Sequence, residues 1–245
     1  MRKVPILNLP AALAVSCAAL ALPPQAPVAT VDSVLHAYVQ ALGGQAALNR
    51  IEDRRIEAKV HHAGKVVYFW AKPNKVVRVA HGEKVGFDGS GSWMLSRKKK
   101  LTKLPKAEQW ELETDANPVR FAHLKALYDD VEPAAAERLD DRPMNVLVAP
   151  NNIGATKFYF DAASHLLVRI EEFGVTSAYY KQVTEFSDYK TADGIQFPFR
   201  IVHSTTEPGM KDKELRIASL DQNVGLKPEF FTKPQLGAVT LGGKR

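Results

Sequence analysis

The chain has 245 residues, of which 45% are hydrophobic and 24% are charged. This is the composition of an ordinary globular protein, and it excludes a disordered or fibrous chain. The formal net charge of +6 is modest, and no nucleic-acid-binding motif accompanies it, so we expect no nucleic-acid partner.

The N-terminus has the pattern of a secretory signal peptide. Arg2 and Lys3 form a short basic start, residues 4–22 carry no charge, and small residues follow among prolines. We predict a Sec-type signal peptide over residues 1–29, cleaved after Ala21 or near Ala29, and export of the mature chain. The apolar run is short for a membrane span, and an uncleaved N-terminal anchor is the alternative.

Cys17 is the only cysteine. Its place after Ala14-Val15-Ser16 leaves lipidation as an alternative, although the following residues stay apolar where a lipidated start would turn polar. Cleavage downstream of Cys17 leaves a mature chain without cysteine, which excludes a disulfide, a thiol nucleophile and a thiolate metal site.

The first element of the mature chain is predicted to be a helix over residues 31–42. Its apolar residues recur at steps of three and four, which places them on one helical face. Thr30 or Asp32 can cap its start, and Gly43-Gly44 can end it. A short helical turn is expected over residues 45–51.

Strands then dominate, with apolar and polar residues alternating between turn signals such as Asp88-Gly89. The first group of predicted strands is 55–60, 66–71, 76–80, 85–88 and 92–96. The second group is 135–139, 144–149, 156–160, 166–172, 177–189, 195–205 and 213–224. Such a succession indicates an antiparallel up-and-down sheet, not βαβ units.

One more helix is predicted between the two groups of strands. Asn117 can cap it, Pro118 suits its first position, and Phe121 and Leu124 share its apolar face until Pro133 stops it. We therefore predict a mainly β (α+β) fold: a curved antiparallel sheet, or incomplete β-barrel, with two or three helices packed in its mouth. The sheet forms one domain over residues 30–235, and residues 236–245 are expected to be a flexible C-terminal tail.

The sequence contains no recognisable catalytic or metal-binding pattern. No two histidines have helical spacing with a nearby carboxylate, and His61-His62 are adjacent on a strand end, where successive side chains face apart. The Gly-rich stretch 87–93 lacks the lysine of a phosphate-binding loop. We expect no catalytic residues, no metal and no cofactor.

The strongest charge feature is the basic run that contains Lys98, Lys99 and Lys100. It is interpreted either as a solvated hairpin or as a docking site for anionic headgroups or an acidic partner.

Large apolar residues on the strands and the second helix are candidates to line an apolar ligand cavity, although each of them can instead be ordinary core. These candidates are Val67, Phe69, Phe87, Trp93, Phe121, Leu124, Phe158, Phe160, Val168, Ile170, Phe197 and Phe199. The consecutive Tyr68, Phe69 and Trp70 place large groups on both faces of one strand, so both faces of the sheet must be covered.

Several segments resemble the LolA-like family of outer-membrane lipoprotein-sorting proteins. The most specific is Asp193-Gly194-Ile195-Gln196-Phe197-Pro198-Phe199-Arg200, a tight turn followed by an apolar-Pro-apolar-basic strand. The others are residues 38–48, 86–89 followed by Trp93, 158–161, 166–169 and 188–189. The resemblance implies a half-barrel over residues 30–235 whose concave face holds acyl chains under a helical lid.

The resemblance also implies a periplasmic, non-enzymatic carrier for an acyl chain, a lipid or a lipoprotein. Its expected partners are lipid or lipoprotein acyl chains and a membrane-associated protein, and the chain is expected to be a monomer. One alternative is a periplasmic interaction or sensing module that binds a protein partner. Another is an enzyme that orients an apolar substrate.

Overall fold

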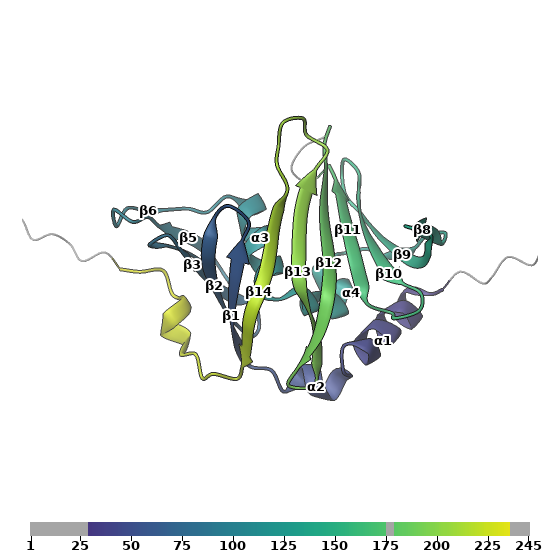
Figure 1. Ribbon diagram of the computed structural model, residues 1–245, viewed down its shortest axis with the longest axis horizontal. Helices are drawn as coiled ribbons and strands as arrows, with labels where there is room; N and C mark the ends of the chain where they lie inside the picture. The colour runs from purple at the N-terminus through teal and green to yellow at the C-terminus, as the bar shows by residue number, and fades with distance from the viewer. Residues whose placement is uncertain (1–28, 175–178, 236–245) are drawn as a thin grey trace, which may run out of the picture.

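The computed structural model describes residues 29–174 and 179–235. The predicted signal peptide and the predicted C-terminal tail therefore lie outside the described residues, apart from Ala29. Within the described ranges, fourteen strands form one antiparallel sheet, in the order β6-β5-β4-β3-β2-β1-β14-β13-β12-β11-β10-β9-β7, with β8 paired to β9 (Figure 1). The sheet is curved and does not close into a barrel.

The strands on one side of the junction between β1 and β14 come from the first part of the chain. They are β1 (Asp53–Val60), β2 (Gly64–Ala71), β3 (Lys75–Ala80), β4 (Glu83–Phe87), β5 (Ser92–Leu95) and β6 (Leu101–Thr102). The others are β7 (Glu132–Pro133), β8 (Glu137–Leu139), β9 (Arg142–Pro150), β10 (Ala155–Asp161), β11 (Leu167–Phe173), β12 (Lys181–Ala192), β13 (Ile195–Thr205) and β14 (Lys213–Gln222). Because β1 pairs with β14, two meanders distant in sequence form one continuous sheet.

Short helices cover one face of the sheet, which is called the concave face here. They are α1 (Val31–Ala41), α2 (Gln45–Asn49), α3 (Lys106–Ala116), the 3-10 helix η1 (Pro118–His123) and α4 (Leu124–Leu127). Thr30 caps α1, its hydroxyl accepting a hydrogen bond from the Ser33 backbone N–H at 3.2 Å. A further 3-10 helix, η2 (Pro228–Phe231), follows β14. Among the described residues, no helix is long and apolar enough to cross a membrane.

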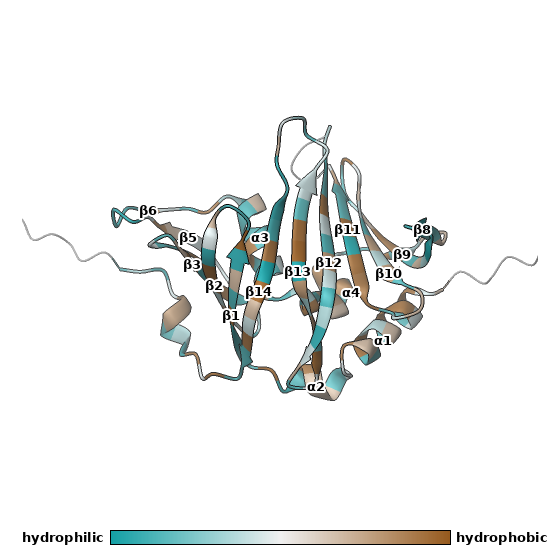
Figure 2. Ribbon diagram, in the orientation of Figure 1, coloured by the Kyte–Doolittle hydropathy of each residue, from teal (hydrophilic) through white to brown (hydrophobic). Residues whose placement is uncertain are grey.

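Alternation along the strands decides which side chains reach the concave face. On β2, Tyr68 and Trp70 are buried there in the main hydrophobic cluster, whereas Phe69 packs in a second cluster with Trp93 and Phe231. Figure 2 shows the same alternation as brown and teal bands along β13 and β14. The η2 segment covers the second cluster, and the Trp93 indole donates a hydrogen bond to the Phe231 carbonyl at 3.2 Å.

The helices on the concave face fill much of the space that the sheet encloses. Phe121 of η1 has no exposed surface, and its ring lies 5.7 Å from that of Phe158 and 6.4 Å from that of Phe186. Leu112 of α3 and Leu124 of α4 are likewise fully buried. The prediction that helices pack in the mouth of the sheet is confirmed.

Two details of the predicted elements are wrong. The helix expected after Asn117 is divided into η1 and α4 and ends at Leu127, because β7 begins at Glu132. Helix α3 was not predicted at all, because its apolar residues form no continuous stripe at helical spacing.

Candidate functional site

Helix α3 lies against the concave face and is tied to four strands. Its backbone lies close to β2 and β3, and its side chains reach residues of β2, β13 and β14. The central tie is Asp115, which has no exposed surface. The Tyr68 hydroxyl donates to Asp115 Oδ2 at 2.5 Å, and His203 Nε2 lies 2.8 Å from Oδ1. Burial and the Asp115 carboxylate raise the pKa of Tyr68 well above its usual value, so its hydroxyl remains a donor.

Three polar side chains form a row across β12, β13 and β14. The sheet register places Thr184 opposite His203 and His203 opposite Lys213. Thr184 Oγ1 lies 3.0 Å from His203 Nδ1, so both ring nitrogens of His203 have partners. The row fixes the imidazole against Asp115 and thereby holds α3 to the sheet.

Lys213 is the positive charge of this network. Its ammonium pairs with Glu111 of α3 and lies 3.6 Å from Asp115 Oδ2. Burial, reinforced by the nearby Arg78 guanidinium, lowers the pKa of Lys213 to about 8, while Glu108 opposes that shift. We call the group formed by Tyr68, Glu111, Asp115, His203 and Lys213 the α3 latch.

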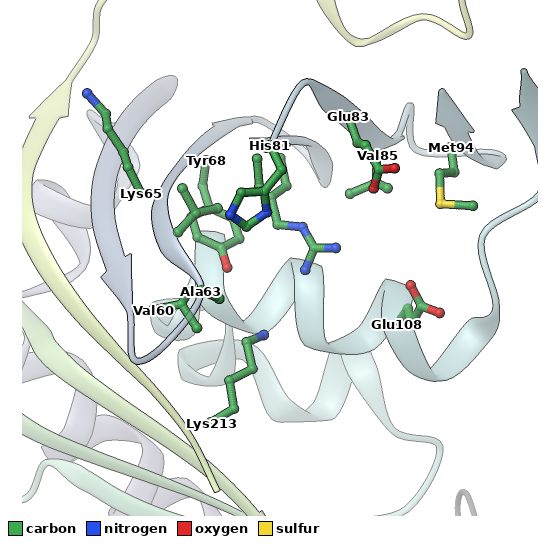
Figure 3. A pocket seen from close by; sticks show the side chains of 13 residues that line it. Val60, Ala63, Lys65, Tyr68, His81, Glu83, Val85, Met94, Glu108 and Lys213 are labelled. Atoms are coloured by element: carbon green, nitrogen blue, oxygen red, sulfur yellow. The ribbon is translucent and has the colours of Figure 1, made fainter. Parts of the chain in front are cut away.

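A pocket of about 260 Å³ opens between α3 and the β1–β5 strands, and we call it the strand pocket (Figure 3). Its apolar wall consists of Val60, Val66, Ala80, Val85 and Met94.

Charged groups line the rest of the strand pocket. Arg78 of β3 is one of its lining residues. Lys213 of β14 also faces the pocket, and Glu108 projects from α3 opposite Val85 and Met94 (Figure 3). An apolar wall beside a few convergent polar groups is typical of a small-molecule site.

A second pocket, of about 650 Å³, lies on the other side of α3, and we call it the Glu172 pocket. Trp110 and Glu111 line it from α3, and Glu172, Thr184 and His203 line it from the sheet. Glu172 is 6% exposed. Burial raises the pKa of Glu172 to about 7, although the His203 and Arg120 charges act against this rise.

Arg54 is a second buried charge, deeper in the core. It is 1% exposed, and its guanidinium lies over the rings of Trp70 and Phe197 at 5.0 and 5.2 Å. It donates one hydrogen bond, 3.1 Å long, to the Asn117 side chain at the end of α3. Burial lowers the pKa of Arg54 to about 9.

The network contains a set of possible metal ligands that the sequence did not indicate. One ligand atom each of Glu111, Asp115 and His203 lies within 4.8 Å of the others. The Lys213 ammonium, however, already lies against both carboxylates. Asp115 and His203 are 88 residues apart, so no local spacing could have revealed their contact.

The structure brings most of the predicted cavity residues together on the concave face. Buried in the main cluster are Phe87, Phe121, Leu124, Phe158, Phe160, Ile170 and Phe197, with Phe199 packed against it and partly buried. The remaining candidates do not line this face. Phe69 and Trp93 belong to the second cluster, Val67 shares the alternation of Phe69, and Val168 packs against a third cluster with Tyr159.

Two surface features noted in the sequence, the basic run and the pair of adjacent histidines, can be located in the structure. Lys98, Lys99 and Lys100 are exposed in the turn between β5 and β6, next to the outer edge of the sheet. His61 and His62 do not face apart as predicted, because His62 turns into a left-handed conformation with φ of 60° and the two rings lie 3.8 Å apart.

The fold is LolA-like, similar to that of three solved structures. A LolA superfamily protein from Nitrosomonas europaea superposes with a TM-score of 0.59 and 13% sequence identity over 84% of this chain and 98% of that chain. A putative outer membrane lipoprotein-sorting protein domain from Vibrio parahaemolyticus superposes with a TM-score of 0.55 and 13% sequence identity over 76% of this chain and 93% of that chain. A DUF1329 family protein from Desulfovibrio piger superposes with a TM-score of 0.54 and 12% sequence identity over 82% of this chain and 97% of that chain.

These likenesses agree with the resemblance seen in the sequence segments, and they concern the fold. No family model matches the sequence, and no curated protein is similar to it.

Proposed function

We propose that the protein is a periplasmic carrier that holds an acyl chain of a lipid or lipoprotein on the concave face of its half-barrel. The observation that carries this proposal is that a short helical segment covers the apolar concave face. The apolar interior is covered by the short α3–η1–α4 segment, which the polar α3 latch holds in place, and the apolar wall of the strand pocket opens beside α3. The segment is short, and a ligand that enters would take the places of its buried side chains Leu112, Phe121 and Leu124 once the polar contacts of the latch break.

The size of the strand pocket indicates how the ligand enters. About 260 Å³ is slightly below the roughly 300–1,000 Å³ of typical ligand sites. In this proposal the pocket accepts one end of the chain, and the remainder enters as α3 moves and Phe121 and Leu124 give up their places. Burial of about ten methylene groups would contribute roughly 8 kcal/mol before the costs of opening, enough for reversible binding.

The proposal gives the α3 latch a structural role. Thr184, His203 and Asp115 form a hydroxyl–imidazole–carboxylate chain, in which His203 and Asp115 also join α3 to the sheet. We propose that this chain holds the helix in place and that the protein binds its ligand without catalytic activity. The predicted signal peptide supports a periplasmic location.

The test is native mass spectrometry with lipid extraction on the mature protein from the periplasm, followed by titration with a fluorescent fatty acid. Met94→Asp, which puts a charge on the partly exposed apolar wall of the strand pocket, is expected to weaken binding about tenfold or more. The control Met210→Asp changes a methionine that is 61% exposed, and it should bind like the parent protein. A protein that carries no lipid and takes up no fatty acid would overturn the proposal.

A further inference from the structure

Glu172 is a buried carboxyl group without a partner. Its residue is 6% exposed on β11, yet within residues 29–174 and 179–235 its carboxylate makes no hydrogen bond or ion pair. The other buried carboxylates of that part of the chain are satisfied: Asp53 by backbone N–H groups, Asp115 by the α3 latch and Asp161 by Ser164 and Arg142. A carboxyl group that the protein largely covers, but that has no protein partner, is open to a hydrogen bond from a ligand.

The charges near Glu172 are already engaged elsewhere. Arg120 pairs with Glu113, and His203 lies against Asp115 and Thr184. Both act on Glu172 only through space, and their effect is smaller than that of burial. The free carboxyl group therefore opens onto the Glu172 pocket and not toward a protein partner.

The walls of the Glu172 pocket favour a positive charge. Glu108, Glu111 and Glu207 line it together with Glu172, whereas Lys106, exposed at the start of α3, is its one lysine. Trp110 adds an aromatic ring, and ring faces attract ammonium groups. Since Lys213 already occupies the cation position between Glu111 and Asp115, Glu172 is the buried carboxylate of this pocket that remains for a ligand.

We propose that the Glu172 pocket binds the positively charged amino group of an amphiphilic ligand, with the Glu172 carboxylate as hydrogen-bond acceptor and Trp110 against its side. This inference rests on the proposed function, because the apolar part of the same ligand would lie under α3. It adds that the cargo has an ammonium headgroup.

The experiment compares three probes with the same chain: dodecylamine, which is an ammonium ion near neutral pH, 1-dodecanol and dodecanoate. Affinities are measured by isothermal titration calorimetry below the concentration at which the probes aggregate. The parent protein is expected to bind the ammonium probe about tenfold or more tightly than the alcohol, as a buried charged hydrogen bond would give. The carboxylate probe is expected to bind more weakly than the alcohol.

Glu172→Gln keeps the shape of the side chain and removes its charge, and it is expected to lower the affinity for the ammonium probe about tenfold. Glu132→Gln, on an exposed residue of β7, is the control and should keep the preference of the parent protein. Equal binding of all three probes, or a preference that survives in Glu172→Gln, would overturn this inference and leave the carrier proposal intact. Binding of none of the probes would overturn both.

Discussion

At the scale of single residues, the Gly86 backbone lies close to the Trp93 ring. This close approach allows Trp93 to pack against η2, which covers the second cluster on the outer face of the sheet. A Cβ atom built on Gly86 would lie 2.5 Å from the Trp93 ring, which belongs to the cluster sealed by Phe231. The ring cannot shift freely, because its indole N–H is bonded to the Phe231 carbonyl.

Gly86→Ala is therefore expected to lower the free energy of unfolding by about 1–3 kcal/mol through overpacking. Gly91→Ala is the matched control, because a Cβ at Gly91 meets nothing within 4 Å, and it should be nearly neutral. Urea denaturation of both variants gives the comparison. Equal stabilities would show that Trp93 is free to move.

The Glu172 carboxyl gives a second prediction at the residue scale. Its pKa is about 7 in the folded protein against an ordinary value of 4.5. Between these values the folded state keeps a proton that the unfolded state releases, so this group makes the free energy of unfolding fall as the pH rises. The contribution is complete below about pH 4.5 and is lost above about pH 7, with a total on the order of 3 kcal/mol.

Glu172→Gln removes this contribution. The parent protein should lose stability relative to the variant by up to about 3 kcal/mol between pH 5 and pH 8. Urea denaturation of both proteins at the two pH values measures the difference, and all other titrating groups cancel in the comparison. Parallel pH profiles would mean that the carboxyl group is solvated or paired.

At the scale of secondary-structure elements, α3 is held by polar contacts more than by an apolar stripe. Of its residues, Leu112 and Ala116 are buried apolar ones, while Thr114 and Asp115 are buried and polar. The sequence signal for this helix was weak for the same reason. By contrast, the predicted helix over residues 31–42 matches α1, because its apolar stripe packs directly against the sheet.

Tyr68→Phe tests the α3 latch. It removes the hydroxyl that donates to the fully buried Asp115, and it should lower the free energy of unfolding by about 1–3 kcal/mol. Amide hydrogen exchange should accelerate in α3 more than in the sheet, because the latch is what joins them. Tyr180→Phe, on a partly buried residue without a hydroxyl contact among those described, is the control and should change neither quantity. Uniform acceleration across the molecule would contradict a local latch.

At the scale of the whole molecule, the β1–β14 pair makes two meanders into one sheet. The pairing joins residues such as Lys59 and Arg216, which are far apart in sequence, and Arg216 also pairs with Arg200 of β13. Every strand of the first meander is therefore connected to the second through one central strand. We expect a single cooperative unfolding transition.

Arg216→Pro tests this connection. Proline removes a backbone N–H from a central strand, and it should cost about 3 kcal/mol or more. Arg216→Ala changes the same exposed side chain but keeps the N–H, and it should be nearly neutral. Near-UV and far-UV circular dichroism should follow one coincident transition in both variants. A proline variant in which one meander melts alone would show that the halves are separable.

The sequence by itself determined the local features: the alternating strands, the capped first helix and the turn at Asp193-Gly194, whose residues both have positive φ in the structure. It also predicted a curved antiparallel sheet with helices in its mouth. These features depend on neighbours within a few residues, which a single sequence displays directly.

Only the tertiary structure decided which strand faces meet and which polar groups converge. Val67 and Phe69 lie on the side of β2 away from the main cluster, which a sequence cannot reveal because a shift of one residue exchanges the two faces of a strand. The contacts of Asp115 with Tyr68 and His203 span 47 and 88 residues, and they arise only when the sheet curves around α3. The partnerless carboxyl of Glu172 is likewise a property of packing, since burial, and not its neighbours in sequence, sets its chemistry.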